Sequence, residues 1–322
     1  MDLFESLKNK INGKNLTIVF PEGEEPRILG AAVRLLKEKI LSPILIGDVA
    51  EITKVAADKS FDISGIKIVD PKKYAEFDTM IEKFVECRKG KNTKEQAEKM
   101  LLDNNYFGTM LVYLDKADGM VSGAIHSTGD TVRPALQIVK TAPGNSRISG
   151  SFIMQKGDER YMFADCAINI NPNAQELAEI AIQTAEDAKL FDIDPKVAML
   201  SFSTKGSAKS DDVTKVAEAT KIANELAPDL PLDGELQFDA AFVPSVGAQK
   251  APGSKVAGHA NVFVFPELQS ANIGYKIAQR FGGFEAIGPI LQGLAKPISD
   301  LSRGCNEEDV YKSAILTAAL AL

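Results

Sequence analysis

LTIVF (residues 16–20), PEGEEP (21–26), RILGAAVRLLKEK (27–39) and SPILIG (42–47) follow one another near the start of the chain. The first and last are short apolar runs, which are typical of strands buried on both faces. Apolar residues recur at helical spacing along 27–39, and this predicts an amphipathic helix between the two strands. A strand, a turn, a helix and a second strand form the repeating unit of a parallel sheet covered by helices.

The same alternation continues along the chain and predicts an α/β fold. Further strands are expected at 66–69, 117–123, 149–154, 161–164, 197–202 and 262–265, and further helices at 74–89, 93–103, 174–188 and 307–322. KGDE (156–159) predicts a turn between two paired strands. Continuous apolar strands separated by helices indicate mostly parallel sheets. Two loop-like stretches, 141–150 and 295–300, are candidate crossings between two domains.

Composition excludes several classes of protein. Of 322 residues, 45% are hydrophobic and 25% charged, which is the balance of a globular protein. The formal net charge is −7, whereas a protein that binds duplex nucleic acid usually has a basic face, so no nucleic-acid partner is expected. No stretch reaches the roughly 20 apolar residues of a membrane helix, and the N-terminus lacks the apolar region of a signal peptide. Cys87, Cys166 and Cys305 are odd in number and far apart, so we expect no disulfide framework, no zinc site and a cytoplasmic location.

Several common ligand motifs are missing from the sequence. It contains no G-x-x-x-x-G-K-[ST] loop for nucleotide phosphates and no G-x-G-x-x-G turn for a dinucleotide. H-E-x-x-H and G-x-S-x-G are missing as well. Because His126 and His259 are the only histidines, histidine-based catalysis has few candidates, and no metal site is expected.

GAIHSTGDTVRP (123–134) is the richest candidate for a ligand site. It follows a predicted strand, where open α/β sheets place their ligands. Small residues free backbone N–H groups, hydroxyl groups add donors, and Arg133 offers a planar fork for an anion. The alternative is a strand–helix turn in which a Ser or Thr caps the helix. His126 by itself is expected to be a hydrogen-bonded structural residue.

DLSRGCNEEDV (300–310) leads into the last predicted helix. With Asn306 as N-cap, Asp309 takes the third helical position, where an acid completes a capping box and complements the helix dipole. A functional role requires a carboxylate near a hydroxyl and a guanidinium, and Ser302 and Arg303 lie just before the helix. On the pattern alone, capping is the favoured role of Asp309.

Three other segments have structural explanations that the pattern favours. ECRKGK (86–91) is a basic helix end, which either complements the helix dipole or clamps a phosphate. Cys166 follows a strand, but no histidine lies beside it, and buried cysteines usually behave as small hydrophobes. STKGSAKS (203–210) leads into a helix whose first residues are acids that already complement the dipole.

Together these segments resemble the phosphate acetyl/butyryl transferase family. The resemblance lies in the glycine-rich stretch 118–134, TAPG (141–144), FADCA (163–167), 261–276 and 295–309. The segments follow the family's order over nearly the whole chain. No single segment is decisive, but the combination is specific.

The resemblance implies two α/β domains with an interdomain cleft, a layout similar to that of isocitrate and isopropylmalate dehydrogenases. Residues 1–143 and 296–322 would form the first domain, completed by the C-terminal helix, and 144–295 the second. The same resemblance implies that Ser302, Arg303 and Asp309 line the cleft.

Roles follow from the resemblance residue by residue. Asp309 is implied to be the general base for the thiol of coenzyme A, Ser302 to hydrogen-bond the sulfur, and Arg303 to hold the phosphate. The remaining implied substrate-binding residues are Arg88 and Arg133 for coenzyme A and Arg280 as a further arginine of the cleft. Apart from the resemblance, Ser127, Thr128 and Thr131 are expected to bind substrate by adding backbone N–H donors. Near Arg88, the neighbours Cys87 and Gly90 depart from the family pattern.

The implied reaction is the reversible transfer of an acetyl group between coenzyme A and inorganic phosphate, through direct attack of the thiolate in a ternary complex. Coenzyme A and acetyl phosphate are substrates, no tightly bound cofactor or metal is expected, and a homodimer is implied. Two alternatives stay open: the same reaction on a butyryl group, and a non-catalytic regulatory domain of the kind fused to malic enzymes. A dehydrogenase with the same layout would need metal-binding aspartates and a nicotinamide site, and the sequence offers neither.

Overall fold

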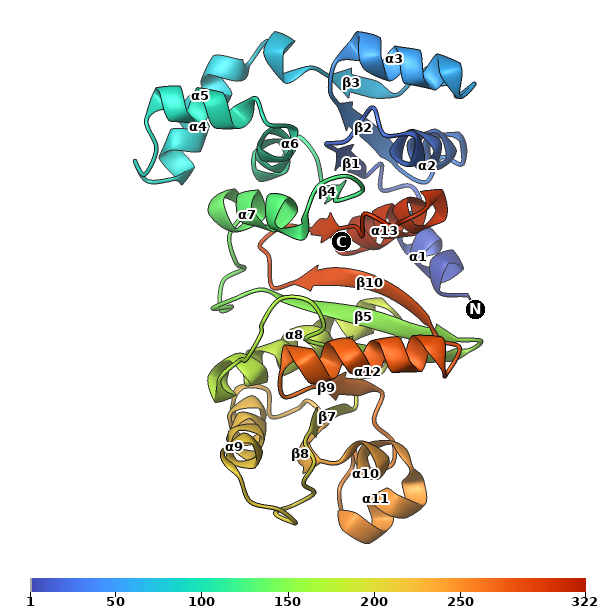
Figure 1. The fold of residues 1–322 in the computed structure, drawn as a ribbon, viewed down its shortest axis with the longest axis vertical. Coiled ribbons are helices and arrows are strands. Elements are labelled where there is room, and N and C mark those ends of the chain that lie inside the picture. The colour runs from blue at the N-terminus through green and yellow to red at the C-terminus, as the bar shows by residue number, and fades with distance from the viewer. Residues whose placement is uncertain (1) are drawn as a thin grey trace. The chain divides into compact units, whose positions relative to one another are not determined.

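The computed structural model describes residues 2–322, which divide into two compact units (Figure 1). The first unit takes in the chain up to Pro143 and again from Leu294 to Leu322, and the second runs from Gly144 to Gly293. The second boundary lies two residues before the one expected at 295/296. Each unit has its own sheet, and the predicted class of two α/β domains with mostly parallel sheets is confirmed.

The sheet of the first unit has five strands, all parallel. They are β1 (Thr17–Phe20), β2 (Ser42–Ile46), β3 (Lys67–Val69), β4 (Gly119–Ser122) and β11 (Ile298–Asp300), in the order β11-β4-β1-β2-β3. The stretch 295–300 was expected to be a connecting loop, but its second half forms β11 at the sheet edge. These three residues form a strand because they pair with β4. Their own sequence does not predict one.

Helices cover both faces of this sheet. On one face lie α1 (Leu3–Ile11), α2 (Pro26–Lys37) and α13 (Glu307–Ala319), with α13 packed on β1, β4 and β11 and α3 (Val49–Asp58) beside α2. On the other lie α4 (Phe77–Cys87), α5 (Lys94–Leu101), α6 (Asn104–Tyr113) and α7 (Thr128–Ile138), which share one buried apolar cluster with the strands. A short helix, η1 (Pro71–Lys73), joins β3 to this second group. Alternation along β4 explains the two layers, since Gly119 faces α13 and Met120 joins the opposite cluster.

The sheet of the second unit has six strands in the order β10-β5-β6-β9-β7-β8. They are β5 (Ser149–Lys156), β6 (Glu159–Ala164), β7 (Val197–Leu200), β8 (Leu232–Leu236), β9 (Val262–Val264) and β10 (Glu285–Gln292). The predicted hairpin is confirmed, because β5 and β6 pair antiparallel around the turn at Gly157 and Asp158. β10 also pairs antiparallel with β5, and the other pairs are parallel.

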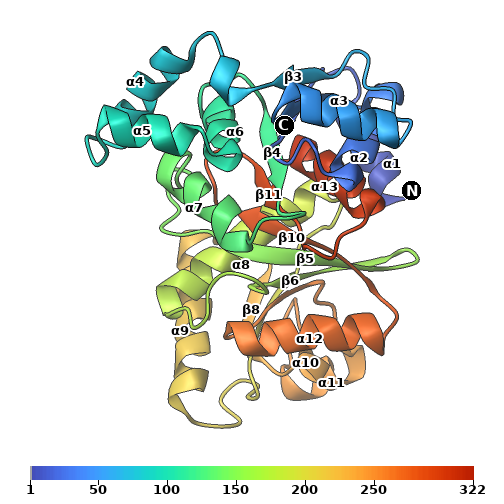
Figure 2. The same cartoon turned by 45° about the horizontal axis from the view of Figure 1, so that its top comes forward.

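Five helices belong to this second unit. They are α8 (Ala174–Leu190), α9 (Asp211–Leu226), α10 (Phe238–Phe242), α11 (Pro244–Lys250) and α12 (Leu268–Arg280). Figure 2 shows α12 running along the sheet, where it packs on β5, β6 and β10. Within residues 2–322, no helix is both long enough and apolar enough to cross a bilayer.

The two crossing segments lie side by side. Thr141 and Leu294 form an antiparallel bridge, and the N–H of Ala295 donates to the carbonyl of Lys140 at 3.0 Å. The chain therefore leaves the first unit and returns to it at one place. The returning segment leads directly into β11 and α13.

Candidate active site

The two candidate segments meet because their strands are neighbours. β4 and β11 run parallel and end at Ser122 and Asp300, so their following loops leave the same edge of the sheet. The N–H of Leu301 donates to the carbonyl of Ser122 at 2.7 Å and fastens the loops where they start. One loop leads into α7 and the other into α13, so two helix N-termini lie at this edge.

Gly123 allows the two loops to approach this closely. Its φ is +114°, in the region that side chains disfavour. A Cβ atom here would lie 2.7 Å from both Asp300 Oδ1 and the backbone nitrogen of Leu301. Any larger residue would push the loops apart.

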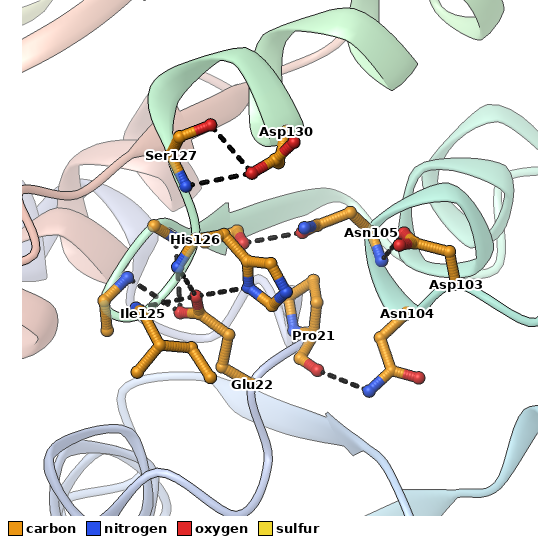
Figure 3. A network of polar contacts seen from close by, with 12 residues as sticks. Pro21, Glu22, Asp103, Asn104, Asn105, Ile125, His126, Ser127 and Asp130 are labelled. Carbon is orange, nitrogen blue, oxygen red and sulfur yellow. Dashed lines mark hydrogen bonds and ion pairs between the residues drawn. The ribbon is translucent and has the colours of Figure 1, made fainter.

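A buried carboxylate organises the loop after β4. Glu22, which is 1% exposed, lies in the turn after β1 and accepts hydrogen bonds from four consecutive backbone N–H groups (Figure 3). These belong to Gly123, Ala124, Ile125 and His126, at 3.2, 2.8, 2.9 and 3.0 Å respectively. Nδ1 of His126 lies 2.7 Å from the same carboxylate. The hydrogen bonds offset the cost of burying the charge.

This network corrects one expectation and confirms another. The segment 123–134 was expected to offer free backbone N–H groups to a ligand, but Glu22 occupies those of 123–126. The structural role expected of His126 is confirmed by its contact with Glu22. The start of α6 supports the same turn, since Asn104 Nδ2 donates to the carbonyl of Pro21 at 2.9 Å (Figure 3).

The three hydroxyl residues at the start of α7 make mostly internal contacts. Ser127 is the N-cap, and its N–H and hydroxyl donate to Asp130 Oδ2 at 3.1 and 2.7 Å, as in the capping alternative. The Thr128 hydroxyl donates to Asp300 Oδ2 at 2.6 Å. Burial raises the pKa of Asp300, and this hydrogen bond partly opposes the rise. Thr131 is fully buried, and its hydroxyl, like that of Thr128, opposes the rise in the pKa of Asp300.

The loop after β11 presents Ser302 and Arg303 to solvent. It is a tight turn in which the N–H of Cys305 donates to the carbonyl of Ser302 at 2.9 Å and the N–H of Gly304 to Ser302 Oγ at 3.3 Å. Both site side chains are exposed, and the Arg303 guanidinium makes no hydrogen bond or ion pair in the part of the chain that the structure describes. Its fork therefore stays available for an anion.

Asp309 occupies the predicted capping box. Its N–H donates to Asn306 Oδ1, and the N–H of Asn306 donates to Asp309 Oδ2, both at 2.9 Å. The carboxylate is exposed, so the cap does not bury it. The pKa of Cys305 is raised mainly by burial, Arg27 lowers it, and the charge of Asp309 raises it further, which places Asp309 and Arg27 near this turn.

Arg88, which caps α4, and Arg133, on α7, both lie away from the N-terminus of α7. Arg88 follows α4 and donates from Nε to Asn92 Oδ1 at 3.0 Å and from Nη1 to the carbonyl of Gln137 at 3.2 Å. Arg133 is exposed on α7, and no hydrogen bond occupies it among residues 2–322. Burial raises the pKa of Tyr106, whereas the charges of Arg133 and Arg88 both lower it.

Arg280 and Cys166 belong to the second unit. Arg280 ends α12 and is exposed. Cys166 is 1% exposed, its thiol donates to the carbonyl of Phe163 at 3.4 Å, and burial raises its pKa well above the usual range. The thiol therefore stays protonated, as its surroundings in the sequence suggested.

Sequence reasoning missed Glu22 and Arg27 in PEGEEPR. Arg27 binds carbonyl oxygens in both site loops. A signal existed, because PEGEEPR follows β1, which neighbours β4 in a parallel sheet. Residues that follow such strands share the sheet edge where α/β proteins place their ligands.

An α/β unit with a free guanidinium and an exposed carboxylate at the carboxyl edge of its strands is typical of an enzyme that acts on a small anionic substrate. The family model described as phosphate acetyl/butaryl transferase matches residues 2–318. The chain belongs to this family, and it is an acyltransferase.

Relatives cover essentially the whole chain. It is 62% identical over 321 residues to phosphate acetyltransferase of Bacillus subtilis, covering 100% of the chain and 99% of that protein. A phosphotransacetylase structure from Streptococcus pyogenes has 64% identity and a TM-score of 0.97, covering 99% of this chain and 98% of the other. The EutD phosphotransacetylase of Staphylococcus aureus has 58% identity and a TM-score of 0.96, with 100% and 98% covered.

Proposed function

We propose that the chain transfers an acetyl group reversibly between coenzyme A and inorganic phosphate. The observation that supports this most directly is the junction of β11 and α13. There a free guanidinium (Arg303), a hydroxyl (Ser302) and an exposed carboxylate (Asp309) lie within eight residues of one another. Relatives named phosphate acetyltransferase, at about 60% identity over the whole chain, favour acetyl over butyryl.

The chemistry needs a thiolate and a stabilised leaving group. A free thiol has a pKa of about 8.5, so only a few per cent is ionised at neutral pH. Asp309 accepts the thiol proton in this proposal, and a positioned base contributes about 10²–10⁴-fold to the rate. Arg303 binds the phosphate oxygens in bidentate fashion and stabilises the charge as phosphate departs. Ser302 hydrogen-bonds the sulfur.

Arg88 and Arg133 fit a role in binding the remote end of coenzyme A. From Ser127 to Gln137, α7 rises about 15 Å at 1.5 Å per residue. Coenzyme A is long and carries phosphates far from its thiol. Arg133, whose guanidinium is free, is the stronger candidate for those phosphates, because Arg88 is already bonded to Asn92 and Gln137.

Direct transfer in a ternary complex, without a metal or a tightly bound cofactor, completes the proposed reaction. Family membership supports a homodimer in the cytoplasm, and we include both in the proposal. A role for Arg280 in the same reaction rests on the resemblance of its segment to the family.

The first test is an assay of acetyl phosphate plus coenzyme A that follows thioester formation. We expect turnover with acetyl phosphate to exceed turnover with butyryl phosphate. A preference for butyryl phosphate would reverse the assignment of the acyl group. Binding of coenzyme A without turnover of either substrate would instead support the regulatory domain.

The second test compares two arginine variants. Arg303→Ala removes the phosphate ligand and is expected to lower kcat by about 10²–10³-fold, the usual cost of losing one group that stabilises developing charge. Arg88→Ala is expected mainly to raise the KM for coenzyme A. Steady-state kinetics with each substrate varied will separate these effects, and the reverse pattern would contradict the assigned roles.

A further inference from the structure

Arg27, the second residue of α2, binds four oxygen atoms with one guanidinium. Nε donates to Glu25 Oε1 at 2.7 Å. Nη1 donates to the carbonyls of Arg303 at 3.0 Å and Cys305 at 2.7 Å, and Nη2 donates to the carbonyl of Ala124 at 2.9 Å. The side chain is 27% exposed. It is therefore half-buried among the groups that it binds.

Three of these acceptors are backbone atoms of the two site loops. Ala124 lies in the loop held by Glu22, and Arg303 and Cys305 lie in the turn after β11. The other hydrogen bonds of residues 302–305 stay inside the turn. In the described part of the chain, Arg27 alone supplies hydrogen bonds to this turn from elsewhere in the sequence.

A guanidinium suits this task better than an ammonium. It is planar and holds its N–H donors in fixed directions, so it can bind carbonyls of two loops at once. The hydrogen bond to Glu25 raises the pKa of Arg27, which stays charged. Because Glu25 balances that charge and the backbone takes three of the donors, little remains for a substrate anion.

We propose that Arg27 is a positioning residue for the transfer reaction. It fixes the backbone from which the Arg303 and Ser302 side chains extend, and it ties this turn to the loop after β4. A displacement of about 1 Å at a reacting group can cost about 100-fold in rate. The proposal rests on the role in phosphate binding proposed for Arg303.

The test begins with Arg27→Met and Arg27→Lys in the full chain. Arg27→Met is expected to lower kcat by about 10–100-fold and to change the KM for coenzyme A by less than about 3-fold, because the thiol end is disturbed and the remote arginines are not. Arg27→Lys keeps the positive charge but loses the planar set of N–H donors, so we expect its kcat to stay close to that of Arg27→Met. Restoration of wild-type kcat by lysine would contradict the proposal.

Arg34→Met is the matched control on the same helix. Arg34 bonds Glu38 at 3.0 Å, pairs with Glu308 and lies over the Tyr311 ring, but it makes no contact with 302–305. We expect this variant to lower the melting temperature at least as much as Arg27→Met while kcat stays within about 3-fold of wild type. Equal losses of kcat in both variants would mean that Arg27 affects turnover only through the general stability of the protein, and this would overturn the proposal.

A double-mutant cycle separates this inference from the proposed function. If Arg27 acts through Arg303, adding Arg27→Met to Arg303→Met should lower kcat by less than about 3-fold further. Full additivity of the two losses would overturn the role of Arg27 while leaving that of Arg303 intact. A wild-type kcat in Arg303→Met alone would instead overturn the function proposed for Arg303.

Discussion

Cys166 follows β6 at a position where a nucleophile would be plausible, yet its surroundings favour the thiol over the thiolate. Burial raises its pKa, Asp165 raises it further, and the thiol donates to a backbone carbonyl. We therefore expect Cys166→Ala to keep most of the turnover while lowering the free energy of unfolding by about 1 kcal/mol, the centre of the range for single substitutions. Turnover and urea unfolding measure the two effects. Complete loss of turnover, with an acetylated thiol trapped in the wild type, would contradict direct transfer.

Single residues differ in how well the sequence predicted them. The capping box at Asn306 and Asp309 is local, three residues apart, and its pattern predicted its geometry. Glu22 and Arg27 went unnoticed because their partners are backbone groups 97 to 278 residues away. A side chain's identity indicates what it can bind, but only the sheet order determines which backbone atoms reach it.

The start of α13 combines helix capping with proposed catalysis, and two substitutions separate these roles. Asp309→Asn keeps an oxygen that accepts the N–H of Asn306, but it removes the proposed base. We expect kcat to fall by about 10²–10⁴-fold and the melting temperature to change little. Steady-state kinetics and thermal unfolding provide the two measurements.

Asn306→Ala is the complementary variant. It removes the oxygen that accepts the N–H of Asp309 and should cost about 1 kcal/mol of stability, with a far smaller loss of kcat than Asp309→Asn. A larger loss of turnover in Asn306→Ala than in Asp309→Asn would mean that Asp309 serves only to cap the helix and is not the base.

Some elements had a clear pattern and were predicted, whereas others had a weak pattern and were missed. β1, β2 and α2 were found because short apolar runs flank an amphipathic segment. β10 was missed because its sequence, EAIGPILQ, contains a glycine and a proline, which weaken a strand pattern. A proline is tolerated there because β10 is the edge strand of its sheet. α6 was missed because its apolar residues lie on nearly every side, which leaves no helical period to detect.

At the scale of the whole chain, the return of the C-terminus to the first sheet was the least predictable feature from residue patterns. β11 has three residues and joins β4 from about 180 positions away in the sequence. The family resemblance implied that the C-terminal segment completes the first domain, whereas hydrophobic periodicity predicted only a loop at 295–300. Pairing at such long range depends on the assembled sheet, which no local pattern contains.

The stability of the second unit should depend on pH through Asp187. This carboxyl lies on α8, Gln292 Nε2 donates to its Oδ2 at 3.0 Å, and burial raises its pKa to about 7. A carboxyl whose pKa is raised on folding binds its proton more tightly in the folded state. Its contribution to stability is therefore fully present below its unfolded pKa of about 3.9 and is lost as the pH rises through 7.

Asp187→Asn removes this titration and keeps an oxygen for Gln292. We expect the variant to match the wild type near pH 4 and to become more stable than it by roughly 1–4 kcal/mol at pH 8, since each pKa unit corresponds to about 1.4 kcal/mol. Urea unfolding at pH 4, 5, 6, 7 and 8 will give the difference. Glu218→Gln on α9 removes an exposed acid from the same unit and should give a difference that hardly varies with pH. If the two variants showed the same pH dependence, net charge would account for the effect and the titration of Asp187 would not.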